Sequence, residues 1–269
     1  MKKANVFKDW TCTWRLIWAK GWYVPASAVL DVLFLVFYGF MTAPVFDKLT
    51  EHVIVVGTLV TEQVGTVAGR ARPAVIDALF QPPVSRYTWQ FFALLVLLAV
   101  VIFVLFCVFQ GLAWFAASRL AGSKMCWRKY LLAFARINLL WAGIYFLWQC
   151  ADTILKLRGI AVAKMMGQAI PESGIAMPFL LGVVAYFAVI SYPLLEIRRA
   201  FMVGVRKIAI LLPPAVIVVL QFVICNYLLN KLAAINPKLS FIAGAIVLLV
   251  LLAWTRAYVT LVVKRNARV

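Results

Sequence analysis

One carboxylate and one amide lie within apolar stretches of the chain where polar side chains are costly. Asp31 interrupts the apolar stretch 22–46, and Gln110 lies in the charge-free stretch 87–118. An acidic side chain within hydrocarbon is typical of an ion or proton pathway, because the free-energy cost of placing it there must be offset by a function. The favoured interpretation, however, is that such residues form hydrogen bonds between helices and fix their packing. Both interpretations require the two side chains to face a shared interior.

The positions of these two residues predict that they lie at a similar depth. Asp31 follows Lys20 by 11 positions, which is about 16 Å along a helix with a rise of about 1.5 Å per residue. Gln110 precedes Arg119 by nine positions, which is about 14 Å from the same side by the same rise. Asp31 and Gln110 are therefore the principal candidate site within the apolar stretches. The further polar candidates are Gln149 and Gln221, both nearer the other side.

No residue pattern predicts catalysis, a metal site or a cofactor. The only histidine is His52, so the second histidine of a zinc site or of a histidine pair does not exist. The sequence contains no GxSxG, Walker A or HExxH motif. Its five cysteines form no CxxC pair and are expected to be free thiols. We expect a protein that is not an enzyme and that holds no metal or cofactor.

The composition predicts an all-α integral membrane protein with one membrane domain, 1–269. Hydrophobic residues make up 65% of the chain and charged residues only 13%, against about a quarter in soluble domains. About 20 helical residues cross a hydrocarbon core of about 30 Å. The weakest candidate lies between Arg136 and Asp152, where only 15 residues are free of charge. The six predicted spans are about 22–46, 89–118, 133–155, 174–195, 208–230 and 239–263.

Lysine and arginine are distributed unevenly on the two sides of these spans. With a cytoplasmic N-terminus, 18 of the 27 basic residues are cytoplasmic and nine are external. Cytoplasmic loops carry the excess of basic residues in membrane proteins. The bias predicts a multi-pass protein of the cell membrane with both termini in the cytoplasm. Because the basic residues flank the spans, anionic lipid headgroups are the expected partner and nucleic acid is not.

A basic segment precedes the first, third and fifth spans, namely Phe7–Arg15, Arg128–Arg136 and Arg198–Arg206. Each contains two basic residues seven positions apart, about two helical turns, so that both lie on one face. The three pairs are Lys8 and Arg15, Lys129 and Arg136, and Arg199 and Arg206. This pattern predicts short amphipathic helices in the cytoplasmic interface, within a unit of interfacial helix and two spans that occurs three times. The alternative is that these are ordinary basic loops.

The segment 47–86 separates the first two spans and reads as an external helical insertion. Apolar residues recur in it at steps of three and four, which predicts a helix with one apolar stripe over 53–79. We expect one or two helices, broken near Gly69–Pro73 and ended by Pro82–Pro83. The stripe is expected to lie on the membrane, to cap the spans or to bind a protein partner.

These features favour a non-catalytic membrane protein that acts as a scaffold, an assembly factor or an envelope organiser. A transporter or permease subunit is the alternative, either ion-coupled through Asp31 or acting with an ATPase. The size, the segment Phe7–Lys20 and the segment between spans two and three resemble six-span exporter permeases of the ATP-binding-cassette type. The resemblance implies an elbow-like helix and a helix that couples to an ATPase, whereas the insertion 47–86 departs from it. A lipid-modifying enzyme is the third possibility.

Overall fold

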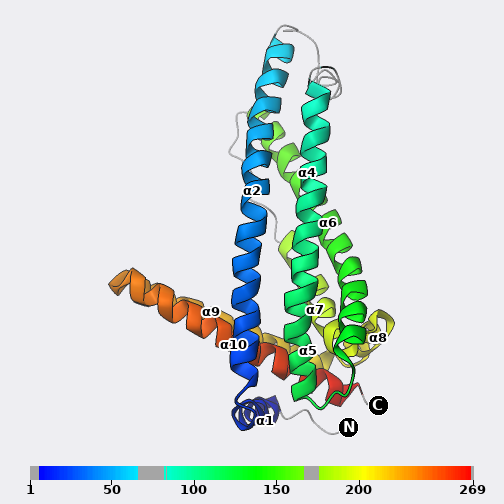
Figure 1. Cartoon of the computed structure of the whole chain (residues 1–269), viewed down its shortest axis with the longest axis vertical. Helices are drawn as coiled ribbons and strands as arrows, with labels where there is room; N and C mark the ends of the chain where they lie inside the picture. The colour runs from blue at the N-terminus through cyan, green and yellow to red at the C-terminus, as the bar shows by residue number, and fades with distance from the viewer. Residues whose placement is uncertain (1–5, 66–81, 83, 167–175, 268–269) are drawn as a thin grey trace. The chain divides into compact units, whose positions relative to one another are not determined.

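The computed structural model is helical throughout the residues that it describes, with no strand among them (Figure 1). It describes residues 6–65, 82, 84–166 and 176–267, and the side chains of all these except 6–8, 57, 60–65, 149–166 and 176–178. Two compact units, Val32–Val108 and the remainder, are described separately. The elements are α1 (Val6–Ala19), α2 (Tyr23–Gly65), α4 (Val84–Leu105), η1 (Phe106–Gln110), α5 (Gly111–Leu120), α6 (Trp127–Met166), α7 (Ala176–Leu194), α8 (Ile197–Arg206), α9 (Ile208–Ile235) and α10 (Pro237–Asn266).

Within the described residues, five helical stretches are long and apolar enough to cross a membrane. They are Tyr23–Val56, Val84–Leu120, Trp127–Trp148, Ile208–Ile235 and Pro237–Asn266. A sixth is obtained if Phe179–Leu194 and Ile197–Arg206, which meet at an angle of 118°, are counted as one span. The predicted all-α class and the apolar helices are confirmed. The predicted spans coincide with helices, apart from residues 22 and 195, which lie in turns, and residues 174 and 175, which lie outside the described residues.

The first long helix differs from the prediction in the unit Val32–Val108. α2 continues without a break to Gly65 and contains Pro44, so the beginning of the helical segment 47–86 is a continuation of the first long helix. A helix has no need to end where the hydrophobic stretch ends, because its backbone hydrogen bonds are internal. α4 begins at Val84, directly after Pro82–Pro83, where the helical part of the insertion was predicted to end. The predicted break near Gly69–Pro73 and the stripe beyond Gly65 lie outside the described residues.

His52 holds α2 and α4 together within this unit. Its Nε2 lies 3.2 Å from Oε1 of Gln90, and its ring makes an edge contact with Tyr87. Its Nδ1 lies 2.8 Å from the carbonyl oxygen of Lys48, one turn earlier in α2. His52 is therefore a half-buried side chain that contacts both helices.

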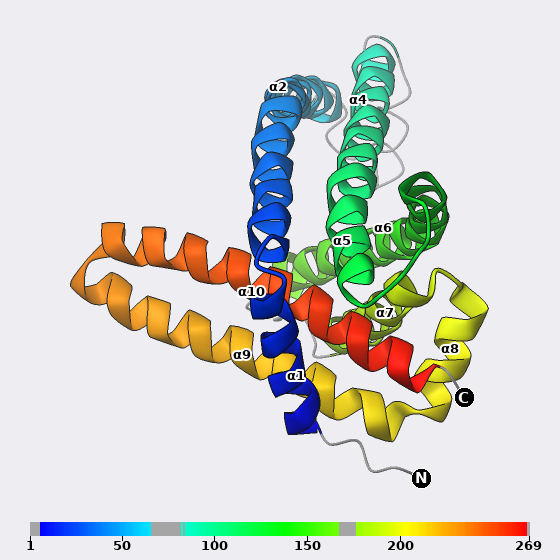
Figure 2. The same ribbon diagram turned by 60° about the horizontal axis from the view of Figure 1, so that its bottom comes forward.

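In the other unit, the core lies against the last four turns of α10. Ala253, Trp254, Ala257 and Tyr258 are fully buried there, and residues of α1, α5, α7, α8 and α9 pack around them. We call this set of buried residues the α10 core. Trp254 lies at its centre, with ring centroids 6.0 Å from Trp14 and 4.7 Å from Tyr258. Figure 2 shows α1 lying across α10 at this point.

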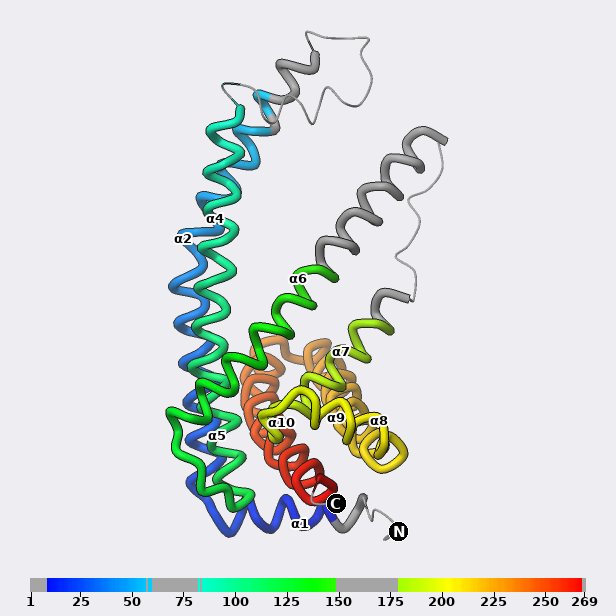
Figure 3. Tube along the Cα trace, turned by 90° about the vertical axis from the view of Figure 1, so that its right-hand side faces the viewer, coloured from blue at the N-terminus to red at the C-terminus, as the bar shows by residue number. Residues whose placement is uncertain are grey.

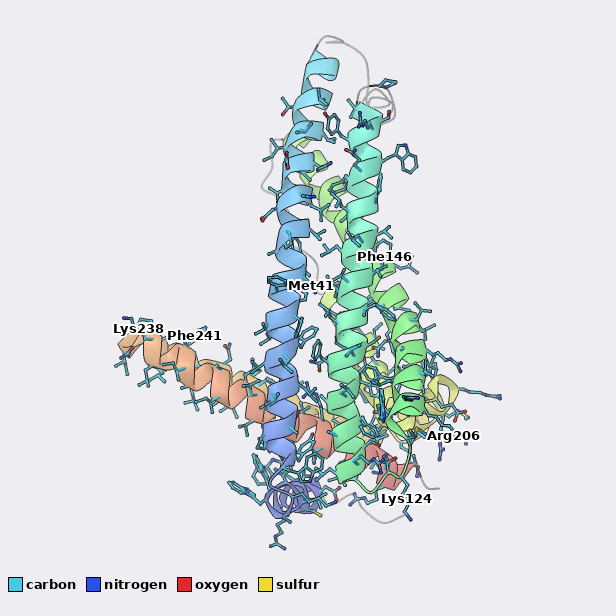
Figure 4. The ribbon with its side chains drawn as sticks, in the orientation of Figure 1. Met41, Lys124, Phe146, Arg206, Lys238 and Phe241 are labelled. Carbon is cyan, nitrogen blue, oxygen red and sulfur yellow. The ribbon has the colours of Figure 1, made fainter. Side chains whose placement is uncertain are left out.

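α9 and α10 form an antiparallel hairpin whose outer half is exposed (Figure 2). The turn is defined by Asn236, whose side chain accepts a hydrogen bond from the backbone N–H of Leu239, and by Pro237 at the start of α10. Phe241 is 78% exposed near the tip, beside Lys238 (Figure 4). Apolar surface of this extent is not stable in water. Lipid or protein must cover the outer half of the hairpin.

The predicted interfacial helix Arg128–Arg136 is instead the beginning of α6. α6 runs uninterrupted from Trp127, and Tyr130 and Phe134 are buried against α5 and α7. The hydroxyl of Tyr130 donates a hydrogen bond to the carbonyl oxygen of Tyr192, and the Phe134 ring lies 4.9 Å from that of Tyr192. The prediction of a separate helix is wrong because the apolar face between the basic residues packs on protein.

α8 is a separate short helix that follows α7 after a sharp turn (Figure 3). Leu195 makes the turn with a φ of 56°, a left-handed conformation that is uncommon for residues other than glycine. Gly204 lets α8 lie close to α7, since an added Cβ would be 2.8 Å from Cε1 of Phe187. Among the three predicted basic helices, α1 and α8 are thus distinct elements, and only the middle one is not.

Candidate functional site

Three polar residues of α2 face α10 from successive turns. Tyr23, Ser27 and Asp31 are spaced four apart, which places them on one side of the helix, and all three are buried. The Tyr23 hydroxyl donates a hydrogen bond of 2.8 Å to the carbonyl oxygen of Ala253. The small side chain of Ala253 lets the backbones of the two helices approach closely. The N-terminal end of α2 is therefore attached to α10 along a polar stripe.

Arg256 of α10 forms a two-pronged pair with Asp31. Its Nη1 donates to Oδ2 of Asp31 at 2.8 Å, and its Nη2 donates to Oδ1 at 2.6 Å. Nη1 also donates to Oγ of Ser27 at 2.9 Å. Only 5% of Arg256 and 3% of Asp31 are exposed. A planar guanidinium matches a carboxylate in this geometry, which makes it one of the strongest polar contacts in proteins.

Gln110 closes the network from a third helix. Its Oε1 accepts a hydrogen bond of 2.7 Å from Nη2 of Arg256, and its Nε2 donates to Oδ1 of Asp31 at 3.1 Å. Gln110 is the last residue of η1, a π-helical turn between α4 and α5. A π turn holds an extra residue and so changes which face of the following helix meets its neighbours; such turns are frequent at functional sites.

The residue after the π turn explains how α5 is positioned. Gly111 is buried, and an added Cβ would lie 2.7 Å from Cδ2 of Leu131 and 3.1 Å from Cδ1 of Phe134 on α6. A larger residue at this contact would require the side chains of Leu131 and Phe134 to shift. The π turn and Gly111 together hold Gln110 in reach of Asp31 and Arg256.

The charges of the network cancel, and its polar atoms form several hydrogen bonds. Asp31 and Arg256 carry opposite charges, the carboxylate accepts three hydrogen bonds and the guanidinium donates four. A buried pair is tolerated when its geometry is good and its remaining polar atoms are satisfied. Chemically the arrangement can join three helices, namely α2, α10 and the helix that contains Gln110. Opening it would leave two separate charges in an apolar environment.

The predicted meeting of Asp31 and Gln110 is present in the structure, and Arg256 is the residue that sequence reasoning missed as their partner. In the sequence, Arg256 lies within the last predicted span, 239–263, near its end, and reads as one of the basic residues on the cytoplasmic side. It precedes Lys264 by eight positions, which is about 12 Å at about 1.5 Å per residue. The depth estimate that paired Asp31 with Gln110 would therefore have included it. Ser27, one turn before Asp31, carried a similar signal.

The other candidate residues lie outside this network. Oε1 of Gln221 is buried without a hydrogen-bond partner among the described residues. Gln149 belongs to α6, but its side chain is outside the described set, as is that of Lys8 in α1. Arg199 donates a hydrogen bond of 2.9 Å to the carbonyl oxygen of Ala267. The remaining members of the three basic pairs are exposed, namely Arg15, Lys129, Arg136 and Arg206.

A second polar set attaches the end of α10 to α1 and α5. Arg265 pairs with Asp9 of α1, and Nζ of Lys264 donates to Oγ of Ser118 in α5 at 2.7 Å. The described residues contain no cluster of histidine, cysteine, aspartate or glutamate that could hold a metal ion. No protein-family model, curated protein or solved structure matches this chain.

Proposed function

We propose that this protein is a non-catalytic scaffold of the cell membrane that crosses the bilayer six times with both termini in the cytoplasm. The observation that carries the proposal is the closed network of Asp31, Arg256, Gln110 and Ser27. This network gives the buried Asp31 a structural role, because it holds α2, α10 and the helix of Gln110 in one arrangement. A scaffold needs such a fixed frame.

The same network argues against an ion-coupled pathway through Asp31. An acid that carries protons must exchange them with water, yet Asp31 is 3% exposed and both of its carboxylate oxygens accept hydrogen bonds from Arg256. An arginine keeps its charge at any physiological pH, so Arg256 places a fixed cation against Asp31. A pathway through Asp31 would have to open this pair and leave the buried guanidinium without its partner.

The apolar helices supply the surfaces on which a scaffold would assemble its partners. Large exposed side chains lie along α6 and the α9–α10 hairpin, among them Phe146, Tyr227 and Phe241 (Figure 4). Exposed apolar surface of this size is characteristic of interaction with lipid or with other proteins. Anionic headgroups at the basic residues and a protein partner at 53–79 are part of this proposal.

A permease subunit is the second candidate, and the start of the chain favours it. α1 is a short helix that ends at Ala19, and a turn at 20–22 leads into the long α2, as in an elbow. The connection between α5 and α6, residues 121–126, contains no helix that would couple to an ATPase. For this reason we place the scaffold first.

Reconstitution into sealed vesicles tests the scaffold against the ion-coupled pathway. With a pH gradient and a trapped pH-sensitive dye, vesicles containing the protein are expected to lose the gradient no faster than empty vesicles. The double variant Asp31→Leu with Arg256→Met is expected to remain folded, because apolar replacement of a whole buried pair is often neutral. Its vesicles should behave as the wild type does.

A gradient that decays faster with the wild type, and that is restored when Asp31→Asn is used, contradicts the scaffold and supports the pathway. Arg136→Gln serves as the control, since Arg136 is exposed on α6 and is remote from the network in sequence. The fraction of protein that elutes as a single peak in size-exclusion chromatography shows that each variant is folded.

Labelling of intact cells with a membrane-impermeant thiol reagent tests the orientation. Cys12 and Cys126 are exposed in the structure and are expected on the cytoplasmic side, so both should react only after lysis. A cysteine introduced by Glu51→Cys, at an exposed position of α2, should react from outside. Mass spectrometry of the labelled peptides distinguishes the sites. Reaction of Cys126 in intact cells would reverse the proposed orientation.

A further inference from the structure

An apolar cavity of about 300 Å³ lies between α7, α9 and α10. Small side chains create the space, namely Gly182 and Ala185 on α7 and Ala215 on α9. A Cβ added at Gly182 would meet no atom within 4 Å, which shows that this wall is open. Its volume is about twice that of an apolar cavity of about 150 Å³ that binds benzene. The space is half open, so a ligand can enter it from the side.

Apolar side chains of all three helices line the cavity. The lining runs from Gly182 to Ile190 on α7, from Leu211 to Val219 on α9 and from Thr255 to Val263 on α10. The volume and the apolar lining suit a segment of a single hydrocarbon chain.

One end of the cavity is next to a group of cations. Lys207 lies one turn before Leu211, and Leu211, Pro214, Ala215 and Val218 continue the same face of α9 along the cavity. Lys207 is half-buried and has no ion-pair partner among the described residues. The preceding α8 adds three exposed arginines, Arg198, Arg199 and Arg206. Arg206 directly precedes Lys207, and Arg199 donates a hydrogen bond to the carbonyl oxygen of Ala267, one turn after Val263 of the lining.

We propose that the cavity between α7, α9 and α10 holds one acyl chain of an anionic phospholipid, whose phosphate lies at Lys207 and the basic side of α8. The chain occupies the space between Gly182 and Ala215, and the headgroup provides the anion that Lys207 lacks. A zwitterionic lipid offers the same hydrocarbon but no net negative charge. The site is therefore selective for negatively charged lipids, a property that goes beyond the scaffold function.

Native mass spectrometry of the full-length protein tests the site. The protein is reconstituted in vesicles of equal phosphatidylglycerol and phosphatidylcholine and is then released into mild detergent. We expect one retained phosphatidylglycerol per wild-type protein. Gly182→Leu fills the cavity and should abolish retention, whereas Gly143→Leu on α6, whose added Cβ also meets nothing within 4 Å, should not. Ala215→Leu is a second filling variant, and thermal unfolding shows which variants are folded.

The headgroup contact is tested with Lys207→Gln. Retention of phosphatidylglycerol relative to phosphatidylcholine should fall about fivefold, the effect of one basic residue near an anionic lipid surface. Lys238→Gln is the matched control, because Lys238 lies at the opposite end of the α9–α10 hairpin. A wild type that retains no phosphatidylglycerol, or equal amounts of both lipids, overturns the proposal whatever the variants do. A folded Gly182→Leu protein that still retains phosphatidylglycerol also contradicts the proposal. The same holds if Lys207→Gln and Lys238→Gln lose the lipid equally, or if the retained molecule has the mass of a different amphiphile.

Discussion

Replacing Arg256 by alanine is expected to lower the free energy of unfolding by about 3–5 kcal/mol, the usual cost of removing one partner from a buried ion pair. The reason is that Asp31 would remain 3% exposed with its charge uncompensated, and Gln110 and Ser27 would each lose a hydrogen-bond donor. Denaturant-induced or thermal unfolding in detergent micelles measures the change. A variant as stable as the wild type would show that the pair is not closed in the membrane.

Two controls separate the pair from the loss of an arginine in general. Arg136→Ala removes an exposed arginine of α6 and should change the stability by less than about 1 kcal/mol. Arg256→Met combined with Asp31→Leu removes both charges and should recover most of the stability, since apolar residues of similar volume often replace a buried pair without loss. The difference between the single and double variants gives the coupling between the two residues.

Replacing Trp254 by alanine is expected to cost about 3–5 kcal/mol, the usual range for truncating a large aromatic residue in a core. Trp254 is fully buried in the α10 core and makes ring contacts with Trp10 and Trp14 of α1 and with Tyr258. The loss should therefore loosen α1 as well as create a cavity. Trp254→Phe should cost less, because a smaller ring still fills part of the space.

Trp18→Ala provides the comparison for Trp254→Ala within the same group of helices. Trp18 lies on α1 but is 79% exposed, so its removal leaves the α10 core unchanged. We expect its unfolding temperature in detergent to remain close to that of the wild type, while that of Trp254→Ala falls by several degrees. Equal effects in the two variants would mean that the packing of α1 on α10 contributes little.

Hydropathy and residue spacing were sufficient to predict the helical class, the apolar stretches and the meeting of Asp31 with Gln110. Hydrocarbon requires its spanning backbone to be helical, so a long apolar stretch determines its own secondary structure. Local spacing predicted helix boundaries less well where one continuous helix contains two segments that the sequence pattern separates. The basic segment Arg128–Arg136 and the span that follows form one α6, and the predicted boundary near residue 47 lies inside α2.

The sequence by itself determined which residues are apolar, where the basic residues flank them, and how far along its own helix each polar residue lies. Only the tertiary structure decided that Arg256 pairs with Asp31 and that Lys207 lies at one end of an apolar cavity. The physical reason is that distance along a helix depends on residue number alone, whereas contact between helices depends on rotation and close approach. Those depend on residues far apart in the chain, such as Gly111 against Leu131 and Ala253 against Tyr23.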